Sequence, residues 1–262
     1  MVAALEPSIG ESEPKMRYAR KGNSSRTAIV TGALAAALIV VSGAPPASAQ
    51  SGATSSAIPK LAGIWHRKGP LNGKPNPPAV PTNRGAGFNQ AFDDAYNPTY
   101  DCSPTPIPGL INDDYDFQII QQADRVIIRY EKMDVVRTIW LEGHGHPTPD
   151  NNVYTNQGHS VGRYEGGRLV VETTHFAFDP RGFSANRWVP GSTLKKMTER
   201  YWREGDTLKL DSVSEDPISL KQPYTYGWEW TVRTEELTPY DCDPQDSRWG
   251  AQWHESKYPP DK

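Results

Sequence analysis

The sequence predicts an all-β fold, an antiparallel up-and-down barrel. From residue 117 onward, short runs rich in β-branched and aromatic residues alternate with turn signals. Two of the connections are glycine turns of similar sequence, and no amphipathic helix of any length competes with these runs. Because closing a sheet removes its exposed edges, sequential hairpins in one domain favour a barrel or a strongly curved sheet.

The first 49 residues have the pattern of a secretory signal peptide. A basic stretch over residues 16–26 precedes an apolar run over residues 27–41, and Ala-Ser-Ala ends at Ala49. The apolar run is shorter than the roughly 20 residues of a membrane-spanning helix. The acidic prefix before Met16 fits this pattern poorly, so Met16 is an alternative start. We therefore expect a periplasmic or secreted protein without a stable membrane span.

The rest of the chain divides by composition. Residues 50–60 are small and polar and predict a flexible leader, residues 61–245 a single barrel domain, and residues 246–262 a polar tail. Within the domain, residues 69–109 are rich in Pro, Gly and Asn. This composition predicts a long segment that wraps across the barrel, and a short helix is compatible with it.

Nine runs predict the strands of the barrel. The first lies around Ile64, and two later hairpins turn at Gly166-Gly167 and at Gly205-Asp206, where glycine supplies the positive φ of a tight turn. The other predicted strands span residues 117–121, 125–132, 135–142, 160–165, 168–176, 194–203, 207–215 and 224–235. Several of these runs are apolar on both faces, so alternation alone does not tell which face lines the bore.

The charge and the aromatic content of the chain indicate which kinds of partner it binds. The net charge is −3 with both signs mixed, which argues against nucleic acid. Eight tryptophans and twelve tyrosines suit a cavity for an aromatic or apolar small molecule, and they equally suit a filled core. Oligomeric state is left open. The predicted substrate-binding residues are Tyr164, Trp140, Trp228 and Trp230.

Cys102 and Cys242 are the two cysteines of the chain, and each stands in a Tyr-Asp-Cys-x-Pro context. In an oxidising compartment an isolated pair usually forms a disulfide, and this one would tie the two ends of the domain together. Two free or metal-binding thiols are the alternative.

Two resemblances add to this reading. Gly63-Ile64-Trp65 resembles the Gly-x-Trp that begins the first strand of lipocalin-like (calycin) barrels. Residues 158–173, GHSVGRYEGGRLVVET, resemble the GHSIGRWEGDTLVVDT core of a poorly characterised family of secreted bacterial proteins. That resemblance extends over residues 61–240, but Pro190-Gly191-Ser192-Thr193 stands where the family has a His-Ser-Glu. The resemblance implies the barrel fold and export. It does not indicate which activity the protein has.

Four of the six histidines gather before and within the predicted hairpin, and His144, His146 and His159 are the predicted catalytic histidines. A histidine near its ordinary pKa of about 6.5 can move protons at neutral pH, with Glu172 as partner and Arg163 as anchor for an oxyanion, both expected to face inward. The alternative for Arg163 and Glu172 is a cross-strand ion pair. The same histidines could form an open zinc or copper site. For His175, at a predicted strand end, a structural role is the better prediction.

The leading hypothesis is an exported, cofactor-independent isomerase, lyase or hydrolase that uses His/Glu acid–base chemistry on an aromatic or apolar substrate. One alternative is a non-catalytic, lipocalin-like ligand-binding protein. Another is a metal-dependent enzyme or metal carrier that uses His144, His146 and His159. The chain contains no nucleophile elbow, phosphate loop or dinucleotide fingerprint.

Overall fold

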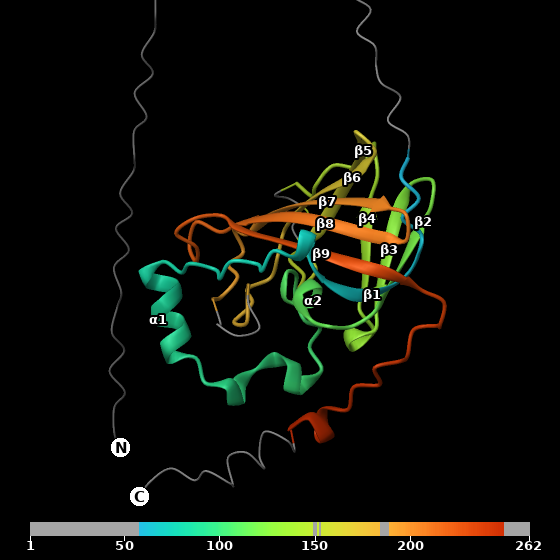
Figure 1. Ribbon diagram of the computed structural model, residues 1–262. Helices are drawn as coiled ribbons and strands as arrows, with labels where there is room; N and C mark the ends of the chain where they lie inside the picture. Colours follow the sequence, from blue (N-terminus) through green and yellow to red (C-terminus); the bar gives the residue numbers. More distant parts are fainter. Residues whose placement is uncertain (1–57, 149–150, 152, 184–188, 249–262) are drawn as a thin grey trace, which may run out of the picture. The chain divides into compact units, whose positions relative to one another are not determined.

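The computed structural model describes residues 58–148, 151, 153–183 and 189–248 (Figure 1). All of them belong to one compact unit, Gly52–Lys262. The predicted signal peptide, most of the predicted leader and most of the predicted polar tail lie outside the described residues.

Within the described residues, nine strands close into one barrel in chain order, and β9 pairs with β1 (Figure 1). The prediction of an all-β barrel is confirmed. The strands are β1 Gly63–Pro70, β2 Phe117–Gln121, β3 Arg125–Tyr130, β4 Val136–Trp140, β5 His159–Glu165, β6 Arg168–Thr174, β7 Lys196–Glu204, β8 Thr207–Glu215 and β9 Tyr224–Arg233.

The two predicted glycine hairpins join β5 to β6 and β7 to β8. Glu165 pairs with Arg168, and Glu204 pairs with Thr207, so each loop has two residues. The glycines in these loops have φ between +57° and +75°, a conformation that costs glycine little and other residues more.

The seam between β4 and β5 departs from the predicted antiparallel order. These two strands run parallel and pair only through Ile139 with Ser160 and Trp140 with Val161. Parallel neighbours require a connection that returns to the starting end of the sheet. Residues 141–158 make this return, and we call them the crossover segment.

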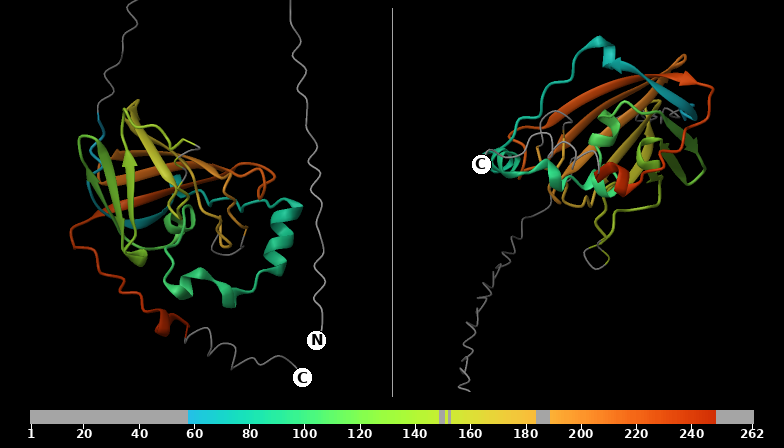
Figure 2. Two further views of the ribbon diagram at one scale, coloured as in Figure 1. Left: turned by 180° about the vertical axis from the view of Figure 1, so that it is seen from behind. Right: turned by 90° about the horizontal axis from the view of Figure 1, so that it is seen from below.

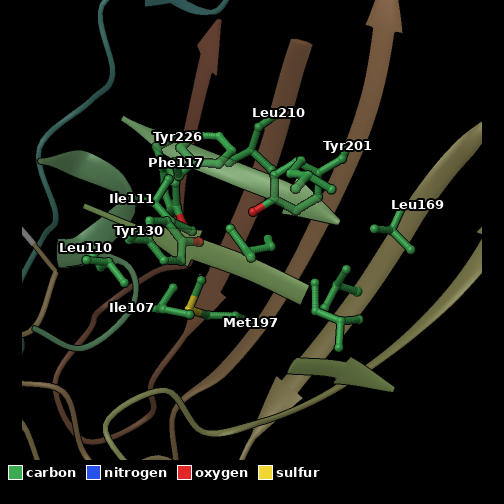
Figure 3. Close-up of a cluster of buried hydrophobic side chains, with 14 of the residues drawn as sticks. Ile107, Leu110, Ile111, Phe117, Tyr130, Leu169, Met197, Tyr201, Leu210 and Tyr226 are labelled. Carbon is green, nitrogen blue, oxygen red and sulfur yellow. The ribbon is translucent and has the colours of Figure 1, made fainter. Parts of the chain in front are cut away.

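Side chains alternate between the bore and the outer surface, as β8 illustrates: Leu208, Leu210, Ser212 and Ser214 are buried in turn. Figure 3 shows Tyr130, Tyr201, Met197 and other labelled side chains of the core converging from several strands. Trp65 and Trp230, at 0% and 1% exposed, belong to the same cluster. Aromatic side chains therefore fill this core, which is one of the two roles predicted for them.

A buried polar network joins the neighbouring strands β4, β5, β6 and β7 among these apolar groups. The guanidinium of Arg137 donates to Ser160 Oγ over 3.1 Å and to Thr173 Oγ1 over 2.9 Å, and it pairs with the carboxylate of Glu199. The hydroxyl of Tyr201 donates to the same carboxylate over 2.7 Å. Burial raises the pKa of Tyr201 well above its ordinary value, so this hydroxyl stays a donor at neutral pH.

The segment between β1 and β2 wraps across one end of the barrel (Figures 1 and 2). It contains the short elements η1 Leu71–Gly73, η2 Asp94–Tyr96 and η3 Pro98–Asp101, and the helices α1 Asn83–Ala91 and α2 Gly109–Asn112. Leu110 and Ile111 of α2 are buried in the main core. The Cys102–Cys242 disulfide is present and links this segment to the chain after β9, as predicted.

The compatible short helix is α1. Thr82 is its N-cap, and the Thr82 side chain accepts a hydrogen bond of 3.0 Å from Gly85 N. The Thr82 hydroxyl also donates to Ile218 O, which fixes the start of α1 to the β8–β9 loop. In the described part of the chain, no helix combines the length and apolarity that a bilayer span requires.

Candidate functional site

The structure brings three histidine rings together, His146, His159 and His175, which we call the histidine cluster. Nδ1 of His146 lies 3.1 Å from Nδ1 of His159. The ring centroid of His175 lies 6.0 Å from that of His146 and 6.5 Å from that of His159. The side chains of all three residues are partly exposed, so the cluster is accessible to solvent and to small solutes.

The cluster lies on the outer wall of the barrel. On β5, Ser160 and Gly162 are buried toward the bore, so the alternate residue His159 points outward. His146 comes from the crossover segment, and His175 directly follows the end of β6. His175 has a left-handed backbone, φ 59°, which turns the chain away from the strand direction.

Gly158 allows the close approach that forms the cluster. Its φ is +66°, and a Cβ at this position would lie 2.6 Å from Thr174 O, far inside van der Waals contact. Thr155 and His175 are joined by a 3.1 Å hydrogen bond from Thr155 N to His175 O. The glycine and this bond hold the end of the crossover segment against the end of β6.

Burial and the neighbouring rings favour the neutral form of His146 and His159. Burial lowers the pKa of His146 and of His159, and the neighbouring imidazoles lower each pKa further. For two neutral rings at this distance, one Nδ1–H donates to the lone pair of the other Nδ1. The pair is therefore suited to exchanging a proton or to offering nitrogen lone pairs to a metal ion.

His144 does not join the cluster, which corrects the predicted set. Its ring packs against Trp140, with centroids 4.8 Å apart, on the outer face of β4. Arg125 covers the same indole from 4.6 Å. Among the described residues, no group of three His, Cys, Asp or Glu side chains already converges as a metal site.

Arg163 and Glu172 lie on the outer surface, which corrects the prediction that they could serve as inward-facing partners. Their side chains are 47% and 52% exposed and form an ion pair of 2.8 Å across β5 and β6. Arg163 also pairs with Glu165. The cross-strand ion pair was the predicted alternative for these two residues, and it is confirmed.

The predicted substrate-binding aromatic residues occupy separate environments. Trp230 packs in the core with its ring centroid 5.2 Å from that of Phe117. Trp228 lies under Arg67, whose guanidinium carbon is 3.9 Å from the indole centroid. Tyr164 packs against the edge of the core, and its hydroxyl accepts from Gln121 Nε2. With Trp140 on the outer face, these side chains do not share one cavity among those described.

An apolar cleft of about 590 Å³ lies outside the bore, between α1 and the loops that precede β7 and follow β8. Phe178 and Leu194, which contribute to it, are 52% and 56% exposed. A second cleft of about 520 Å³ shares Leu194 and continues along the start of β7 and the β8–β9 loop. The first cleft, which we call the apolar cleft, is lined by Arg84, Gly85, Phe88, Phe178, Pro190, Ser192, Thr193, Leu194, Ile218 and Ser219.

Asp216 fixes the two loops that wall the apolar cleft. Its buried carboxylate accepts from Ser192 N and Ser192 Oγ, and from Ile218 N and Ser219 N, at 2.6–3.1 Å. The contacts of Asp216 in this structure are structural. The cleft walls are therefore held before any ligand arrives.

A buried lysine lies directly after Leu194. The ammonium of Lys195 donates to Ile107 O over 2.6 Å and stands 4.1 Å from the ring centroid of Phe176. Burial lowers the pKa of Lys195 from 10.5 to about 8. This group links the loop before β7 to the wrapping segment.

Sequence reasoning missed two parts of this arrangement. The sequence predicts a structural role for His175, because it stands at a predicted strand end beside Phe176, whereas the structure places its ring beside His146 and His159. The cleft residues Phe88, Phe178 and Leu194 lay in segments predicted as loop or strand end. Their only signal was the presence of large apolar side chains in otherwise polar, Pro- and Gly-rich stretches.

No family model and no curated protein sequence matches the chain. Similar solved structures include a mutant of the fluorescent protein UnaG, 14% identical, with 67% of this chain and 97% of that chain covered and a TM-score of 0.33. Another is the apo lipid binding protein 8 of Caenorhabditis elegans, 10% identical, with 66% and 94% covered and a TM-score of 0.31. The barrel assignment rests on the strand pairing of this chain itself.

Proposed function

We propose that this protein is an exported small-molecule-binding protein and that its ligand, an apolar or aromatic molecule, lies in the apolar cleft. One observation carries the proposal: a preformed cavity of about 590 Å³ whose lining is largely apolar. Ligand pockets of roughly 300–1,000 Å³ with a few polar groups in an apolar lining are typical of small-molecule sites.

The lining supports an amphipathic ligand with a large apolar body. Phe88 and Phe178 stand edge to face with centroids 5.4 Å apart, and Leu194 is largely exposed. Covering such side chains is favourable by roughly 25 cal/mol for each Å² of apolar surface removed from water. Arg84 and the hydroxyl groups of Ser192 and Thr193 supply the polar contacts.

The disulfide supports the exported location. A bridge such as Cys102–Cys242 persists in oxidising compartments and is rare in the reducing cytosol. Together with the signal-peptide pattern over residues 1–49, it supports action in the periplasm or outside the cell.

Titration with the fluorescent apolar probe 1-anilinonaphthalene-8-sulfonate tests the cleft. Leu194→Ser and Val136→Ser form a matched pair, because the two side chains are 56% and 58% exposed and only Leu194 lines the cleft. We expect Leu194→Ser to weaken binding about fivefold, as the loss of one apolar contact of about 1 kcal/mol implies, and Val136→Ser to leave it unchanged. Equal effects of both substitutions would place the probe elsewhere and refute the proposal.

A second candidate function is a cofactor-independent isomerase, lyase or hydrolase with His146 and His159 as the proton-transferring pair. The Nδ1–Nδ1 distance of 3.1 Å between two neutral rings favours it. Arg163 and Glu172 would act from the outer surface, beside the cluster. For a compound that the protein binds and converts, His159→Ala should abolish turnover and leave binding largely intact; equal loss of both would favour the non-catalytic binder.

A further inference from the structure

We infer that His146, His159 and His175 together form a binding site for one divalent transition-metal ion of the zinc and copper class. The site lies apart from the apolar cleft, shares no residue with its lining and does not depend on the proposed ligand. It uses His175 in place of His144, which packs against Trp140. A bound metal ion would occupy the nitrogen lone pairs that metal-free proton transfer needs, so the two uses of these rings exclude each other.

The distance between the first two nitrogens fits a shared metal ion. Imidazole nitrogens bind zinc at about 2.0–2.1 Å, so two such ligands of a tetrahedral ion are roughly 3.3 Å apart. Nδ1 of His146 and Nδ1 of His159 are 3.1 Å apart.

The ring separations show how far the third ligand must move. Two imidazoles on one tetrahedral ion have ring centroids roughly 5 Å apart, given the bond lengths above. The centroids of His146 and His159 are 5.2 Å apart, while His175 lies 6.0 Å and 6.5 Å from them. His175 must therefore approach by about 1 Å, and the facing rings of the pair must turn their lone pairs toward a common point. The terminal torsion of a histidine side chain is broad and allows such turns.

Thr174 prepares His175 for this role. Oγ1 of Thr174 lies 2.7 Å from Nδ1 of His175, which leaves Nε2 as the nitrogen available to a metal ion. Metal-bound histidines commonly hold their other ring nitrogen by such a hydrogen bond, which fixes the tautomer and the ring orientation.

The chemistry of the ligand set selects the class of metal. Three imidazoles without a carboxylate suit zinc and copper and do not suit calcium or magnesium, which prefer oxygen ligands. The nearby carboxylate of Glu172 is already paired with Arg163. Three protein ligands leave one position of a tetrahedral ion for water, as in catalytic rather than closed structural zinc sites.

Isothermal titration of the full, untagged protein with zinc chloride tests the site, and copper(II) electron paramagnetic resonance counts the coordinating nitrogens. We expect one equivalent of zinc and three nitrogens on copper. Each of the substitutions His146→Ala, His159→Ala and His175→Ala should weaken zinc binding by about tenfold or more. Two control variants, His144→Ala and His66→Ala, should change it by less than about twofold, since both remove a histidine outside the cluster.

Three results would overturn the inference: binding of less than about a tenth of an equivalent, equal loss in His144→Ala, or full retention of affinity in His175→Ala. Circular dichroism of each variant separates misfolding from ligand loss. Thr174→Val supplies a further readout, because it keeps all three ligands and should weaken binding by less than His175→Ala does. Probe binding in the apolar cleft should be the same in these variants, so failure here leaves the proposed function standing.

Discussion

Nη1 of Arg137 donates a hydrogen bond of 3.0 Å to Oε1 of Glu199 inside the bore, where the two side chains are 1% and 0% exposed. A charge removed from water in this way is tolerated only while its partner is present, because an unpaired buried charge is strongly destabilising. The other hydrogen-bond partners of the pair include Ser160 on β5, Thr173 on β6 and Tyr201 on β7.

Replacement of Arg137 by Met should therefore lower the free energy of unfolding by about 3–5 kcal/mol, because it leaves Glu199 charged, buried and short of donors. Urea denaturation measures the effect. The double variant Arg137→Met/Glu199→Leu should lose less stability than Arg137→Met alone. Additive losses from the two positions would contradict this account of the pair.

Stability should depend on pH through Lys195, whose pKa falls from 10.5 to about 8 on folding because of burial. Between these values the unfolded chain binds more protons, so the contribution of Lys195 to stability rises with pH from about 8 toward 10.5. Relative to Lys195→Met, the protein should gain about 2–3 kcal/mol between pH 7 and pH 10. If the free energies of unfolding of the two proteins change in parallel with pH, the pKa of Lys195 is not lowered by burial. The comparison cancels the titration of the other groups, tyrosines included.

Reduction of the Cys102–Cys242 bridge should destabilise the domain, because the bridge closes a loop with a sequence separation of 140. The chain-entropy model gives an upper figure of about 5 kcal/mol for a loop of this size. Urea denaturation with and without reductant measures the loss, and the Cys102→Ser/Cys242→Ser variant is the control that reductant should not affect. Mass spectrometry verifies that the bridge is reduced. If the urea midpoint of the reduced protein equals that of the oxidised protein, the bridge adds no stability.

Gly158→Ala should cost more stability than Gly166→Ala, although both glycines have positive φ, +66° and +57°. At Gly166 a Cβ meets nothing within 4 Å, so the expected cost is the left-handed conformation alone, about 1–2 kcal/mol. At Gly158 the Cβ also meets Thr174 O, which adds about 1–3 kcal/mol of overpacking. Urea denaturation of the two variants decides the matter, and equal costs would contradict the close approach.

The strands were predictable because their local signals agree. Residues 117–121 and 207–215 were predicted with the bounds that β2 and β8 have, since their β-type residues and the turn signals beside them point to the same answer. Other strands end earlier than the pattern suggests. β6 stops at Thr174, and the left-handed His175 ends the extended chain before its apolar continuation at Phe176.

The site was less predictable, because its geometry depends on contacts between distant segments. Val170 and Leu169 are both buried, so alternation along β6 could not tell that Glu172 faces solvent. His144 and His146 were predicted from their spacing and His159 from its sequence motif, but the parallel β4–β5 seam decides which ring of the crossover segment reaches β5. The apolar cleft is assembled from α1 and two loops that no local pattern connects.

The sparse backbone pairing between β4 and β5 has a consequence for the order in which the barrel closes. Only two residue pairs join these strands, whereas β7 and β8 share nine. Arg137 supplements them from the side, since its guanidinium reaches Ser160 on β5, Thr173 on β6 and Glu199 on β7. Because these partners exist only after β5, β6 and β7 have assembled, we expect ring closure to be a late folding event. The seam that forms last should also be the first to open in the native protein, and amide protons along it should exchange with solvent before those between β7 and β8.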